Sequence, residues 1–134
     1  MYLFDTDTLS NIVKRKPSPK LLKKLQTLPY KLQFTSAINI GEIYYGAERT
    51  DRRDLIIEKF ESFVFPNVQV LSFDHTSAKT YGKIRAILEK RGSVCSEPDL
   101  RIASIAIQHK LILISGNIKH FKKIPGLKID NWIE

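Results

Sequence analysis

Short strand-like segments alternate with amphipathic, helix-like segments along the whole chain. A short segment rich in apolar or β-branched side chains predicts a strand, whereas apolar residues that recur every three to four positions predict a helix. Strands are expected at residues 2–4, 31–36, 68–73, 111–114 and 127–132, and helices at 8–13, 19–28, 38–49, 52–63, 75–92 and 98–108. This alternation predicts an α/β sandwich with a mostly parallel sheet.

The segment at residues 111–114, Leu-Ile-Leu-Ile, has no polar alternation. Such a strand has both faces buried, which is typical of a parallel sheet covered by helices on both sides. The helix before it has only Arg101, Ser104 and Gln108 as a polar stripe, so most of its circumference must also be covered. At 134 residues the chain is expected to form a single domain, residues 1–134.

Capping residues predict where several helices begin. Asp7 or Thr8 is expected to cap the first helix, and Asp51 the helix that ends near residue 63. Gly41 and Gly46 lie inside a predicted helix, where each costs roughly 1 kcal/mol relative to Ala. Their presence predicts that another backbone approaches this helix closely.

Four polar residues are expected to meet at one edge of the sheet. Asp5 ends the first strand, Glu42 lies in the helix after the second, Asp99 opens the helix before residues 111–114, and Asn117 follows that strand. Parallel sheets bind their ligands beyond the carboxyl ends of the strands. Crowded carboxylates repel one another, and a hard divalent cation relieves that repulsion. The pattern therefore predicts a magnesium or manganese site and metal-assisted hydrolysis.

Each of these acids also has a simpler interpretation. Asp5 could only end a strand and start a turn. Asp99 could belong to a capping box with Ser96, in which its carboxylate accepts the Ser96 amide. Glu42 could be a solvated helical residue.

Composition limits the cellular compartments and the classes of binding partner that are expected for this chain. The 22 Lys and Arg exceed the 14 Asp and Glu, which gives a net charge of +8 and a pI near 9.6 and favours RNA or an acidic protein as partner. Arg85, Arg101, Lys119 and His120 are the expected contacts to RNA phosphates. The lone Cys95, the absence of a signal sequence and the lack of any apolar run near roughly 18 residues predict a cytoplasmic protein without a membrane segment.

Several ordered motifs together resemble PIN-domain proteins, and more closely the VapC-type toxin ribonucleases of bacterial toxin–antitoxin pairs. The motifs span nearly the whole chain and read YLFDTDTLS, FTSAINIGEIYYGA, YGKIRAILEKRG, DLRIASIAI, LILISGNIKHFKKIPGL and a closing NW. The resemblance implies a three-layer α/β/α sandwich and a Mg²⁺- or Mn²⁺-dependent endoribonuclease. It also implies a homodimer and an antitoxin whose segment occupies a groove near the active site.

The resemblance further assigns roles to residues of this chain. Asp5, Glu42 and Asp99 fall on the acidic metal-site positions of the family. Asn117 falls where many PIN domains have Asp and many VapC-type chains have Asn, so one tightly bound ion is favoured over two. Thr6 and Ser115 fall at small hydroxyl positions beside the acids, where they would orient them.

Two other functions are weighed against the nuclease. The sequence LFDTDTLS fits the strand motif of haloacid-dehalogenase-type phosphatases, with Asp5 as nucleophile and Asp7 as acid/base. The late Gly-Asp element of that family is missing, because Asn117 follows Gly116 here. The other alternative is a catalytically inactive nucleic-acid-binding or regulatory subunit with the same fold.

Overall fold

The computed structural model describes all 134 residues and contains one sheet of five strands. The strands are β1 (Tyr2–Phe4), β2 (Gln33–Ser36), β3 (Gln69–Leu71), β4 (Ile112–Ile114) and β5 (Ile129–Asp130), in the spatial order β3-β2-β1-β4-β5. Every neighbouring pair is parallel. The predicted α/β sandwich is therefore confirmed, and its sheet is entirely parallel.

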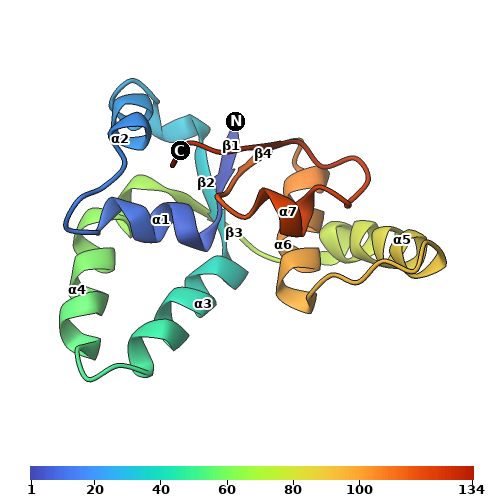
Figure 1. The fold of residues 1–134 in the computed structure, drawn as a ribbon, viewed down its shortest axis with the longest axis horizontal. Coiled ribbons are helices and arrows are strands. Elements are labelled where there is room, and N and C mark those ends of the chain that lie inside the picture. Colours follow the sequence, from blue (N-terminus) through green and yellow to red (C-terminus); the bar gives the residue numbers. More distant parts are fainter.

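Helices cover both faces of this sheet. They are α1 (Thr6–Ile12), α2 (Pro19–Gln26), α3 (Ala37–Glu48), α4 (Arg53–Phe63), α5 (His75–Lys90), α6 (Glu97–Gln108) and α7 (Ile118–Phe121), with short 3₁₀ turns η1 (Tyr30–Leu32) and η2 (Phe65–Asn67). Figure 1 shows α1 to α4 on one side of the strands and α5 to α7 on the other. None of these helices combines the length and the apolar composition that spanning a bilayer requires.

Successive residues of the central strands point into two separate cores. Leu3 of β1 and Leu113 of β4 are buried among apolar residues of α5, α6 and α7. The next residues along, Phe4 and Ile114, are buried among those of α1 to α4, together with Trp132 from the C-terminal segment. This arrangement explains why β4 has no polar alternation, since both of its faces are covered.

Two helices have N-cap residues other than the predicted ones. The first begins at Thr6, with Asp5 at the N-cap position, because the Asp5 carbonyl already accepts the N–H groups of Thr8 and Leu9. The helix expected after an Asp51 cap begins at Arg53. There the Thr50 hydroxyl accepts the Arg52 N–H at 3.2 Å and holds residues 51 and 52 in a turn.

The glycine prediction was wrong in its location. A Cβ added at Gly41 or Gly46 would meet no heavy atom within 4 Å, so no other backbone lies close at these two positions. A close approach occurs instead at Gly116, where it is made by a side chain: an added Cβ would lie 2.7 Å from the Oδ2 of Asp7. The four-residue helix α7, which follows this glycine, was not predicted, because one turn is too short to show a periodic pattern.

Candidate active site

The candidate site lies at the carboxyl ends of β2, β1 and β4, the three central strands. From β1 the chain moves outward through β2 and β3, then crosses to the other side of β1 to form β4. The switch point of a parallel sheet is where its crevice opens. Asp5 leaves β1 and Ser115 leaves β4 at this point, and the Asp5 N–H donates to the Ile114 carbonyl at 2.9 Å.

Asp5 is a buried carboxylate with two hydrogen-bond donors. The Ser115 hydroxyl donates to its Oδ2 at 2.7 Å, and the Asn39 amide donates to its Oδ1 at 3.0 Å. Only 5% of Asp5 is exposed. Burial raises the pKa of the Asp5 carboxyl to about 6 against the lowering effect of the Ser115 hydrogen bond, and the charges of Asp7 and Asp99 raise it further. A second acid and a third therefore lie within electrostatic range of Asp5.

Glu42 joins the same hydrogen-bonded network through Thr6. The Thr6 hydroxyl donates to Glu42 Oε1 at 2.7 Å and accepts from the Asn39 amide at 3.1 Å. Asn39 is itself fully buried and forms a capping box with Ser36, whose backbone N–H and hydroxyl both donate to Asn39 Oδ1. Asn39 thus connects the carboxylate that ends β1 with the helix that carries Glu42.

Sequence reasoning missed Asn39, although a signal was present. Ser36 and Asn39 stand three residues apart at the start of a helix, which is the spacing of a capping box. The usual third residue is Glu or Gln, so the pattern with Asn is easily overlooked.

Asp7 ties the elbow after β4 to α1. Its Oδ2 accepts the Gly116 N–H at 2.8 Å, and the Asn117 N–H donates to the Ser115 hydroxyl oxygen at 3.0 Å. Ser115 is therefore held on one side by the elbow and on the other by Asp5. The Asn117 side chain makes no hydrogen bond and is exposed at the N-cap position of α7.

Asp99 lies in the first turn of α6, where the Ser96 hydroxyl accepts its N–H at 3.3 Å. Ser96 therefore caps α6 as predicted, but the reciprocal bond from the Ser96 amide to the Asp99 carboxylate is not formed, so the capping box is incomplete. The imidazole of His120 lies beside this carboxylate, with its Nδ1 3.8 Å from Asp99 Oδ2. The carboxylate remains available to a ligand.

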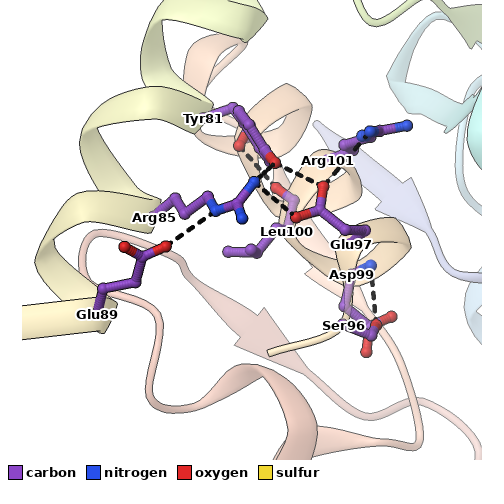
Figure 2. A network of polar contacts seen from close by, with 9 residues as sticks. Tyr81, Arg85, Glu89, Ser96, Glu97, Asp99, Leu100 and Arg101 are labelled. Carbon is purple, nitrogen blue, oxygen red and sulfur yellow. Dashed lines mark hydrogen bonds and ion pairs between the residues drawn. The ribbon is translucent and has the colours of Figure 1, made fainter. Parts of the chain in front are cut away.

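Glu97 forms ion pairs with both arginines that the sequence predicts as RNA contacts. Figure 2 shows Arg85 and Arg101 converging on its carboxylate, with nitrogen–oxygen distances of 3.0 and 3.4 Å. Tyr81 donates to the same carboxylate at 2.5 Å, and Arg85 also pairs with Glu89 at 3.1 Å. The Tyr81 hydrogen bond lowers the pKa of Glu97, as do the two arginine charges.

The chemistry of the residues present suits a hard cation. All candidate ligands are carboxylate or amide oxygens, the donors that Mg²⁺ prefers. No three His, Cys, Asp or Glu side chains are arranged as a ready metal-binding group. Mg²⁺ does not need such a group, because it keeps several waters and is held by one or two carboxylates together with substrate phosphates. The charge of Asp99 contributes to the raised pKa of Asp5, so these two carboxylates are candidates for such a site.

Fold and site together define a class: three-layer α/β/α proteins with a buried carboxylate at the switch point of a parallel sheet. The model of one family, described as the PIN domain, matches residues 2–127. The chain belongs to the PIN domain family.

Relatives match over nearly their full length. Ribonuclease VapC2 of Haemophilus influenzae is 31% identical over 132 residues, covering 98% of both chains. The tRNA(fMet)-specific endonuclease VapC of Salmonella typhimurium is 30% identical over 134 residues, covering 98% of this chain and 97% of the relative. A crystal structure of DNA-bound VapBC from Salmonella typhimurium superposes with a TM-score of 0.89 at 29% identity, covering 98% of this chain and 97% of that one.

Proposed function

We propose that this protein is a metal-dependent endoribonuclease that acts as the toxin of a toxin–antitoxin pair. The observation that carries the proposal is the Asp5 carboxylate, buried at the switch point and connected through Asn39 and Thr6 to Glu42. Burial disfavours the charged form of Asp5 and so raises its pKa to about 6. A bound cation would stabilise the charged form again. Relatives named as ribonucleases, which this chain matches end to end, support RNA as the substrate class.

The proposed roles follow from the hydrogen bonds. Asp5 and Asp99 would hold the metal ion, and Glu42 would orient the attacking water. Ser115 and Asn39 fix both oxygens of Asp5, while Thr6 fixes one oxygen of Glu42. A bound Mg²⁺ or Mn²⁺ would supply Lewis acidity and a water of lowered pKa. Asn117 contributes a neutral amide, so this edge favours one ion.

The partners are proposed from the same relatives. Structures of VapBC from Salmonella typhimurium and of VapBC2 from Rickettsia felis support an antitoxin as binding partner. With a net charge of +8, this chain favours an antitoxin segment with acidic residues. The homodimer that the resemblance implies stays a prediction, which light scattering of the isolated protein would test.

The test is cleavage of defined RNAs, a tRNA among them, by purified protein in Mg²⁺ or Mn²⁺ and in excess chelator. Cleavage is expected only with the metal, and Asp5→Asn or Asp99→Asn should reduce its rate by orders of magnitude. Asp130→Asn is the matched control, because that acid lies in β5 and bonds to the C-terminal segment instead. Full activity in chelator, or in Asp99→Asn, would contradict the proposal.

The two alternatives fare differently. Membership of the PIN family removes the phosphatase interpretation, and Asp7 is engaged with the Gly116 N–H instead of standing free as an acid/base. A subunit that binds nucleic acid without cutting it would show RNA binding and no cleavage under any metal condition in the same assay.

A further inference from the structure

We propose that a hollow between the α5–α6 loop and α7 is the subsite for the RNA phosphates next to the scissile one, with Lys119 and Lys123 as its cations and His120 in its lining. The hollow has a volume of about 250 Å³, and Asp99 forms part of its lining. This inference rests on the proposed function and names the path by which its substrate reaches the acids. In this proposal the RNA phosphates are bound in the hollow beside α7, and not by Arg85 and Arg101.

The balance of charge in the hollow favours an anion. Asp99 is the only acid in its lining, against the two cations Lys119 and Lys123. Arg85 and Arg101, by contrast, are already paired with Glu97 on the other side of the α6 N-terminus, as Figure 2 shows. Uncompensated cations attract a polyanion more strongly than paired ones, so the free positive charge beside Asp99 is on the α7 side.

Lys123 has a defined place in this hollow. Its ammonium group donates to the Val94 carbonyl in the loop between α5 and α6. The Cys95 thiol lies 4.0 Å from the His120 carbonyl oxygen and forms a second link between loop and helix. An ammonium group has three donors, so Lys123 can hold the loop and still bind a phosphate oxygen.

The hollow is continuous with the proposed metal site through one carboxylate. Asp99 is 21% exposed and its Oδ2 lies 3.8 Å from the imidazole of His120, which is 66% exposed. A phosphodiester held at Asp5 and Asp99 would place the next phosphate of the RNA beside this hollow, because Asp99 forms part of its lining. Lysines read the backbone and not the bases, so the subsite takes any single-stranded segment.

The experiment measures binding of a labelled single-stranded RNA in excess chelator over a series of potassium chloride concentrations. Lys119→Gln and Lys123→Gln should each reduce the slope of log affinity against log salt by about 0.7. Lys83→Gln is the matched control, because it removes the same charge from a hollow on α5 that contains no candidate site residue. A second RNA of unrelated sequence should show the same losses.

Arg85→Gln should leave the slope close to that of wild type. With Mn²⁺ and a cleavable RNA, Lys119→Gln and Lys123→Gln should raise KM with little change in kcat. The subsite is refuted if Lys119→Gln and Lys123→Gln bind as wild type does, if Lys83→Gln loses as much, or if wild type does not bind RNA at low salt. Binding in chelator needs no chemistry, so a protein that never cleaves RNA refutes the proposed function and leaves this result standing.

Discussion

At the scale of single residues, the site depends on one carboxylate in an unfavourable position. Asp5 is buried and accepts hydrogen bonds from Ser115 and Asn39, yet its pKa lies near 6 because burial outweighs those bonds. The folded protein therefore holds the Asp5 proton more tightly than the unfolded chain does. Buried polar sites that serve function commonly reduce stability in this way.

Asp5 is expected to make stability depend on pH. Its pKa is about 6 in the fold against an ordinary 3.8, so the folded state binds more protons between these values and stability falls as pH rises through them. The difference corresponds to roughly 3 kcal/mol. In chelator, Asp5→Asn should be more stable than wild type at pH 7.5 by up to that amount, and should lose this advantage near pH 4.

Urea unfolding at both pH values measures the effect. Asp130→Asn serves as the control, since Asp130 is exposed in β5. An Asp5→Asn variant that is equally destabilised at pH 7.5 and pH 4 would show that its hydrogen bonds outweigh its burial.

Thr6 is expected to act through Glu42 and not on the substrate. Thr6→Val removes the 2.7 Å bond that fixes Glu42 Oε1. Loss of such an orienting partner typically costs about 10–100-fold in activity, and the free energy of unfolding should fall by only about 1 kcal/mol. Thr6→Ser keeps the hydroxyl and should restore kcat, which a purely steric role of Thr6 would not explain.

At the scale of elements, the elbow after β4 connects the sheet to α1. Gly116 lies where the Asp7 carboxylate approaches the backbone, and the same elbow places Ser115 against Asp5. The order of contacts runs from Asp7 to Gly116, then to Ser115 and to Asp5. A change at the surface end of this series is therefore transmitted to the buried carboxylate.

Gly116→Ala tests this connection. The added methyl would lie 2.7 Å from Asp7 Oδ2, so the Asp7 side chain or the elbow must shift. Overpacking of this kind costs about 1–3 kcal/mol, and cleavage should fall because Ser115 moves with the elbow. In Asp7→Ala/Gly116→Ala the obstructing carboxylate is gone, so the double variant should lose less stability than the sum of the single ones. Strict additivity in urea unfolding would refute the contact.

At the scale of the whole molecule, β1 is the centre of the architecture. It pairs with β2 on one side and β4 on the other, and its side chains enter both cores. The switch point of the sheet lies next to β1, and the candidate metal ligands Asp5 and Asp99 come from distant parts of the sequence. Binding at this point should stabilise the entire fold.

Mn²⁺ is expected to raise the melting temperature of the wild-type protein at pH 7.5. A ligand at about 100 times its Kd adds about 2.7 kcal/mol to the free energy of unfolding. Asp5→Asn and Asp99→Asn should respond weakly, whereas Asn117→Asp should respond more strongly because it adds a carboxylate. Differential scanning calorimetry decides the matter without reference to cleavage, and an equal response in all four proteins would place the ion elsewhere.

The order of strands and helices was readable from local patterns. The apolar residues at 111–114, the Ser96 cap and the alternation of elements each depend on residues that are close in sequence, so the sequence displays them directly. Asp5 and Asp99 could be placed at one edge because parallel strands end together. Their roles in catalysis stay a prediction.

Only the tertiary structure decided which side chains meet. Asn39 reaches Asp5 across 34 positions of sequence, and Asp7 reaches Gly116 across 109. The sequence does not show that Arg85 and Arg101 are paired. They form ion pairs with Glu97 because α5 and α6 pack together in the fold. Local periodicity does not predict such contacts. It shows which face of a helix or strand is buried, but not which other element packs against that face.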